Sequence, residues 1–177
     1  MTITYHCRFI VILVLCTAAH AVQVGDLYRA LDTNESVWML KRNYTRPNHT
    51  CVRATKMFLN LTDYQFNQTF LNNTAKESEL LNAKLGCDMK HEYMNVSKTQ
   101  GGVGIQYTLQ SWNDTKKCGI LTFVDPYTNE TQCELYQWGS HVNRTPNECD
   151  SEYNNTCKGN ATQVYFSNCT SDAMVMC

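Results

Sequence analysis

The sequence has no excess of charge of either sign and lacks the common motifs of enzymes. It carries 15 Lys and Arg against 16 Asp and Glu, a formal net charge of -1. A nearly neutral chain offers no basic face to neutralise phosphates, which argues against a nucleic-acid partner. Gly-x-Ser-x-Gly is absent, and Gly101-Gly102-Val103-Gly104 lacks the following Lys and Ser or Thr of a phosphate loop. We therefore expect neither an enzyme nor a cofactor.

Metal motifs and internal divisions are missing as well. No Cys-x-x-Cys occurs, and the later histidines, His49, His91 and His141, are scattered, so no metal site is expected. No repeat, linker or low-complexity block interrupts the 177 residues, a length typical of one domain. After residue 21 no run is apolar enough to span a bilayer.

A long apolar run does occur at the N-terminus. Residues 9–19 are almost wholly apolar, follow the single cation Arg8, and lead into Ala19-His20-Ala21, the pattern of a signal peptidase site. Eleven residues span roughly 16 Å as a helix, about half the hydrocarbon core, which disfavours a membrane anchor. We predict a signal peptide over 1–21 and one secreted, extracellular domain over 22–177.

Asparagine and cysteine usage fits the same compartment. The sequence has 17 asparagines, and thirteen of them precede x-Ser/Thr, where random placement gives roughly three. These predicted glycosylation sites are Asn34, Asn43, Asn48, Asn60, Asn67, Asn72, Asn95, Asn113, Asn129, Asn143, Asn154, Asn160 and Asn168. Eight cysteines remain after residue 21, and an even number in a secreted chain indicates up to four disulfides, with 105 connectivities open.

The remaining sequence is typical of an all-β protein. Gly25 to Thr33 predicts a short amphipathic helix, and 147–158 a second one. Strands are expected over 36–44, 51–61, 64–71, 89–96, 104–111, 117–125 and 131–139, with an eighth near 141–144 and an extended segment over 162–168. This pattern favours an eight-stranded antiparallel up-and-down barrel holding one small ligand. An immunoglobulin-like sandwich is the alternative, but no Trp follows Cys51 until Trp112.

Strand alternation predicts an interior rich in aromatic side chains. A glycosylated Asn43 must face solvent, which directs Trp38, Leu40, Arg42 and Tyr44 inward. The same argument at Asn67 directs Tyr64 and Phe66 inward, and the apolar parity of 104–111 adds Tyr107. Glu134, Tyr136 and Trp138 share one face of their strand. The predicted ligand-binding residues are Trp38, Arg42, Tyr44, Tyr64, Phe66, Tyr107, Glu134, Tyr136 and Trp138.

Each of these residues also has a structural interpretation. The aromatic face is alternatively plain core. Arg42 and Glu134 could form an ion pair with each other, or Arg42 could pack over Trp38 at the barrel floor, since a charge inside a barrel is costly unless paired.

Several segments together resemble the tick salivary lipocalins of the histamine-binding family. They are Cys118-Gly119-Ile120, then after thirteen residues Glu134-Leu135-Tyr136, then after twelve more Cys149. Further matches are Glu35-Ser36-Val37-Trp38, Cys51-Val52-Arg53-Ala54-Thr55 and Gln163-Val164-Tyr165-Phe166-Ser167-Asn168-Cys169. The resemblance covers about residues 26–169.

The resemblance implies a secreted, monomeric lipocalin that sequesters inflammatory mediators of the host: histamine, serotonin or lipids such as leukotrienes. It also implies the disulfides Cys51–Cys169 and Cys118–Cys149, with Cys133–Cys157 as the next pair. Cys87–Cys177 is then expected only because these two cysteines are left over. Gly119 stands where the family has an Asp that helps to bind amines, which would weaken amine binding roughly 10- to 100-fold. Two further hypotheses are an anionic lipid whose carboxylate meets Arg42, and an antagonist of a host protein without a small ligand.

Overall fold

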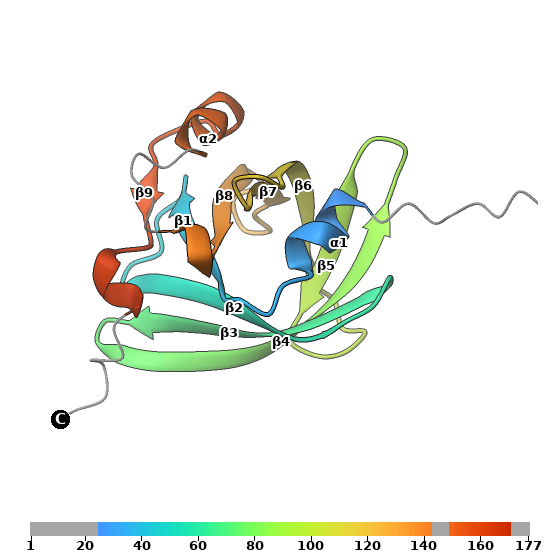
Figure 1. Ribbon diagram of the computed structural model, residues 1–177, viewed down its shortest axis with the longest axis horizontal. Helices are drawn as coiled ribbons and strands as arrows, with labels where there is room; N and C mark the ends of the chain where they lie inside the picture. The colour runs from blue at the N-terminus through green and yellow to red at the C-terminus, as the bar shows by residue number, and fades with distance from the viewer. Residues whose placement is uncertain (1–24, 143–148, 171–177) are drawn as a thin grey trace, which may run out of the picture.

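The chain forms a closed β-barrel with a short helix across one opening, as the computed structural model in Figure 1 shows. The structure describes residues 25–142 and 149–170, so the predicted signal peptide and Asn143 lie outside the described residues. Helix α1 (Asp26–Leu31) precedes the barrel strands β1 (Val37–Arg42), β2 (His49–Leu59), β3 (Asp63–Asn72), β4 (Ala75–Cys87), β5 (Glu92–Ser97), β6 (Ile105–Asn113), β7 (Cys118–Val124) and β8 (Thr131–Trp138). The 3-10 helix η1 (Gly139–His141), α2 (Asp150–Thr156), β9 (Thr162–Gln163) and η2 (Ser167–Thr170) follow.

Antiparallel pairing closes the barrel. Each strand from β2 to β8 pairs with its neighbour in sequence, and β1 pairs with both β8 and β2. The short strand β9 adds to β1 at Lys41↔Gln163. The eight-stranded antiparallel up-and-down lipocalin barrel with short terminal helices is therefore confirmed.

The sequence prediction missed one strand and placed another wrongly. β4 was absent from the predicted strands because much of Ala75–Cys87 is charged or exposed and has low β propensity. The eighth strand expected near 141–144 is wrong in its described part, where residues 139–141 form η1. The count of eight was correct because the missing β4 offset the strand that does not form.

A bulge in β1 changes which side chains face the interior. The pairing with β8 shifts between Met39 and Lys41, so an extra residue, Leu40, interrupts the alternation. Val37 lines the interior cavity, whereas Trp38 and Leu40 pack on the outer face with Cys133, Leu135 and Tyr165. The inward orientation predicted for Trp38 and Leu40 is therefore wrong, while Arg42, after the bulge, does face Glu134 across the strand pair.

The C-terminal segment covers this outer face and is tied down by disulfides. The backbone N–H of Val164 donates to the carbonyl of Leu40 at 2.9 Å. Cys51–Cys169, Cys118–Cys149 and Cys133–Cys157 link strands β2, β7 and β8 to this segment, which confirms three implied pairs. Cys87 is exposed and has no disulfide partner among the described residues, and its expected partner Cys177 lies outside them.

Helix α1 closes one opening of the barrel. Its buried Leu27 and Leu31 are one turn apart and pack against the interior cluster. The carboxylate of Glu92 accepts hydrogen bonds from the first backbone N–H groups of the helix, which have no partner within it. None of the helices in the described part of the chain has the length and apolarity to cross a bilayer.

Candidate ligand-binding site

A cavity of about 120 Å³ lies inside the barrel below α1. Its walls are mainly apolar and include the rings of three tyrosines, one phenylalanine and one tryptophan. The residues that line it include Leu27, Leu31, Val37, Val52, Ala54, Tyr64, Phe66, Gln68, Leu81, Met94, Tyr107, Leu109, Trp112, Gly119, Leu121 and Tyr136. This volume is below the roughly 300–1,000 Å³ of pockets for drug-sized ligands, so the cavity suits a ligand of few atoms.

Glu134 is fully buried behind one wall of this cavity. Its side chain is 1% exposed and accepts a 2.8 Å hydrogen bond from the Tyr136 hydroxyl at Oε2. The Tyr44 hydroxyl donates to Oε1. Tyr136 lines the cavity and thus stands between the cavity and the carboxyl group. Both hydroxyls keep an oxygen lone pair with which to accept a further hydrogen bond.

Burial raises the pKa of the Glu134 carboxyl, because the low-dielectric interior disfavours its charged form. The two tyrosine hydroxyls and the nearby Arg42 and Arg46 act in the opposite direction without reversing the shift. Burial also raises the pKa of Tyr44, Tyr107 and Tyr136, with the charge of Glu134 adding to the effect, so these phenols remain neutral donors.

Arg42 neither pairs with Glu134 nor packs over Trp38. Among the ion pairs of the described residues none joins Arg42 to Glu134. The Arg42 guanidinium donates from Nη2 to the carbonyls of Arg46 at 2.8 Å and His49 at 3.0 Å, and it lies 5.1 Å from the ring centre of Tyr44. Arg53 is the cation that packs on Trp38, at 5.3 Å. Arg42 therefore stabilises the loop between β1 and β2.

The nine predicted residues separate into four groups. Tyr64, Phe66, Tyr107 and Tyr136 line the cavity, whereas Arg42, Tyr44 and Glu134 form the polar cluster beside it. Trp138 lies at the α1 end, where its indole N–H donates to the Ala30 carbonyl at 3.0 Å and its ring packs at a tilt against Trp112. Trp38 lies outside, against Tyr165.

Sequence reasoning missed the cavity residues supplied by α1, β2 and β4. Leu81 and Ala83 alternate with polar residues, and this period of two was the available signal for β4. His49 was also missed. It is buried and packs at a tilt against Phe70 with 4.1 Å between ring centres, and its Nδ1 lies 3.3 Å from Nη1 of Arg42.

Gly119 lies in the cavity wall opposite Tyr136 on β8 and Trp112 on β6. A Cβ at this position would come within 3.1 Å of the Ser111 carbonyl and 3.2 Å of the Trp112 ring. The indole of Trp112 thus occupies the space into which a side chain at 119 would project.

A closed barrel with an internal, mostly apolar cavity and a buried carboxyl group defines a small-ligand-binding lipocalin. The chain belongs to the family described as tick histamine binding protein, which it matches over residues 17–171. No curated protein matched the sequence.

Two solved structures show the same fold. Japanin from Rhipicephalus appendiculatus bound to cholesterol has a TM-score of 0.57 and 11% identity, covering 78% of this chain and 96% of japanin. The AM182 serotonin complex has a TM-score of 0.60 and 14% identity, covering 81% of this chain and 91% of AM182.

Proposed function

We propose that this chain is a secreted salivary protein that binds a biogenic amine of the host, histamine or serotonin, and thereby removes an inflammatory mediator. The observation that carries the proposal is the buried Glu134 carboxyl, held by two tyrosine hydroxyls beside the cavity and without an ion-pair partner among the described residues. A buried carboxylate is costly without a cation, and a bound ammonium supplies one.

The amine would bind through Tyr136. An ammonium in the cavity donates to the Tyr136 oxygen, whose own proton is held by Glu134, and the ring faces of Tyr107 and Trp112 add cation–π attraction. The negative charge of Glu134 thereby attracts the ammonium through the Tyr136 hydroxyl, without direct contact between carboxylate and ligand. In this function the protein acts as a monomer, and none of its residues has a catalytic role.

Secretion is supported by the predicted signal peptide over 1–21 and by three disulfides, which persist in oxidising compartments. We also propose that the secreted protein carries N-linked glycans on sequons among the thirteen predicted. Edman or mass-spectrometric sequencing of the exported protein tests the signal peptide, with Val22 as the expected first residue.

A neutral lipid is the second candidate, because the cavity lining is mainly apolar, and a sterol-sized ligand would require the cavity of about 120 Å³ to widen. An anionic lipid is less suited, since Nη2 of Arg42 already donates to the carbonyls of Arg46 and His49. Calorimetric titration with histamine, serotonin and cholesterol separates these candidates. Submicromolar binding of an amine supports the proposal, whereas binding of cholesterol alone replaces it with the lipid function. Binding of none of them favours an antagonist of a host protein.

A further inference from the structure

The hairpin between β2 and β3 exposes three large apolar side chains. Met57 is 61% exposed, Phe58 51% and Leu61 58%. Clustered exposed apolar side chains on a monomer commonly mark a contact surface. These three lie within three residues of Asn60 along the chain, and Asn60 is the first residue of the sequon Asn60-Leu61-Thr62.

The Asn60 side chain is held so that its amide nitrogen stays available. Its Oδ1 accepts hydrogen bonds from the backbone N–H groups of Thr62 at 2.8 Å and Asp63 at 2.6 Å, and from the Thr62 hydroxyl at 3.2 Å. All the hydrogen bonds that the described residues make with this side chain use Oδ1, whereas a sugar attaches to the nitrogen. Asn43 differs, because its nitrogen donates to the Lys158 carbonyl at 3.0 Å and its oxygen accepts from Cys133 at 2.8 Å.

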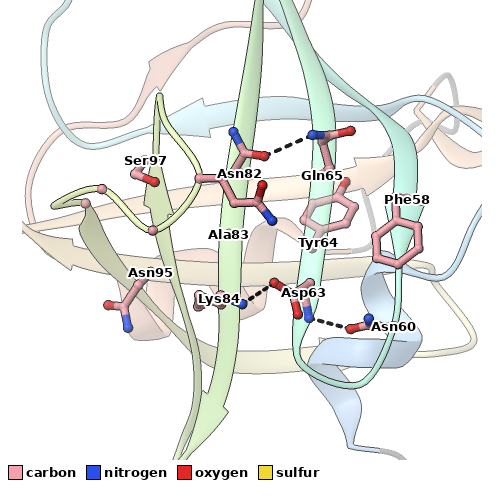
Figure 2. A pocket seen from close by; sticks show the side chains of 14 residues that line it. Phe58, Asn60, Asp63, Tyr64, Gln65, Asn82, Ala83, Lys84, Asn95 and Ser97 are labelled. Carbon is pink, nitrogen blue, oxygen red and sulfur yellow. Dashed lines mark hydrogen bonds and ion pairs between the residues drawn. The ribbon is translucent and has the colours of Figure 1, made fainter.

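A polar groove of about 570 Å³ begins at this hairpin and crosses β3, β4 and β5. Figure 2 shows Phe58 and Asn60 at one side of the groove, Gln65 on the neighbouring strand β3, and Asn82 one strand further across on β4. Gln65 donates to Asn82 at 3.0 Å, and both amides belong to the groove lining. An aromatic ring next to side-chain amides matches a sugar, which has an apolar face of C–H groups and many hydroxyls.

We propose that Asn60 carries an N-linked glycan whose first sugars pack on the Phe58 ring and enter this groove. The glycan covers the exposed apolar side chains of the hairpin and stabilises the β2–β3 pair. This inference rests on the secretion in the proposed function, because the sugar is added only in the secretory pathway. It is independent of the cavity and of its ligand.

Glycopeptide mass spectrometry of the secreted protein first measures occupancy at Asn60. A double-mutant cycle in Tm then compares the wild type with Phe58→Ser, Asn60→Gln and the double variant. The cycle is measured once with glycosylated protein and once with unglycosylated protein from a bacterial periplasm. The unglycosylated cycle controls for the loss of the Asn60 turn. Asn154→Gln, at an exposed sequon on α2, replaces Asn60→Gln in a matched control cycle.

We expect Asn60 to be occupied and Phe58→Ser to lower Tm by roughly 2–4 °C more when the Asn60 glycan is present. In the unglycosylated cycle and in the Asn154 cycle, the Tm changes of the two single variants should add up to that of the double variant. An unoccupied Asn60 beside other occupied sequons, or the same coupling with and without sugar, overturns the inference and leaves amine binding untouched. If no sequon is occupied, the glycan fails together with the proposed secretory route.

Discussion

Tyr136 donates a 2.8 Å hydrogen bond to Glu134, two residues before it on the same face of β8. One ring thereby forms part of the cavity wall and holds the buried carboxyl group. This relationship connects the apolar cavity to the one acidic group that the proposed function requires.

Tyr136→Phe keeps the ring and removes this hydrogen bond. Leaving a buried acceptor without its donor costs roughly 1–3 kcal/mol, and the variant also loses the oxygen that would accept from an ammonium. We expect an amine affinity at least about 10-fold lower by calorimetry. Tyr127→Phe, at a fully exposed tyrosine, is the control. Unchanged affinity in Tyr136→Phe would mean that the amine does not bind through this hydroxyl.

Substitution of Gly119 tests how tightly the cavity wall is packed at this position. Gly119→Ala places a methyl group against Trp112 and the Ser111 carbonyl, and overpacking of this kind costs roughly 1–3 kcal/mol. We expect chemical denaturation to show this loss, and Gly119→Ala combined with Trp112→Leu to be less destabilised than the two separate effects predict. Strict additivity would show that Trp112 does not fill this space.

His49 gives the fold an acid sensitivity. Burial, followed by the charges of Arg46 and Arg42, lowers the pKa of His49 to about 4. The unfolded chain therefore binds a proton on this residue between about pH 6.5 and 4 that the folded chain does not, so stability falls as pH falls through this window.

His49→Gln removes this contribution, which is on the order of 3 kcal/mol. The measurement is the difference in unfolding free energy between variant and wild type at pH 7 and pH 4. A His91→Gln control replaces an exposed histidine. Parallel pH profiles for wild type and His49→Gln would contradict the assignment.

Amine binding itself should depend on pH. Because burial raises the Glu134 pKa, acidification protonates this carboxyl at a higher pH than an ordinary glutamate and removes the charge that attracts the ligand. Serotonin is the suitable probe, since its amine stays protonated throughout. We expect its Kd to rise as pH falls below neutrality. A Kd that is constant down to the ordinary glutamate pKa would argue against a role for Glu134.

Most strands of the barrel could be predicted from the sequence, because they contain many β-favouring residues and have clear boundaries. Side-chain orientation was harder to predict. One bulged residue, Leu40, reversed the side of the barrel on which Trp38 lies, and alternation alone contains no signal for a bulge. The cluster around Glu134 was partly predicted, since Tyr136 shares its parity. The bonds of Arg42 to the Arg46 and His49 carbonyls depend on loop conformation, which periodicity does not specify.

The most direct measurement is calorimetric titration of Glu134→Gln with histamine and serotonin, beside the wild type. Glutamine retains the shape of the side chain and one acceptor oxygen while removing the charge, and its NH2 group donates to the tyrosine hydroxyl that loses its acceptor. We expect the variant to bind the wild-type protein's amine with roughly 10- to 100-fold lower affinity, with the fold unchanged by circular dichroism. Equal affinity in the two proteins would contradict the central claim that the Glu134 charge binds the amine.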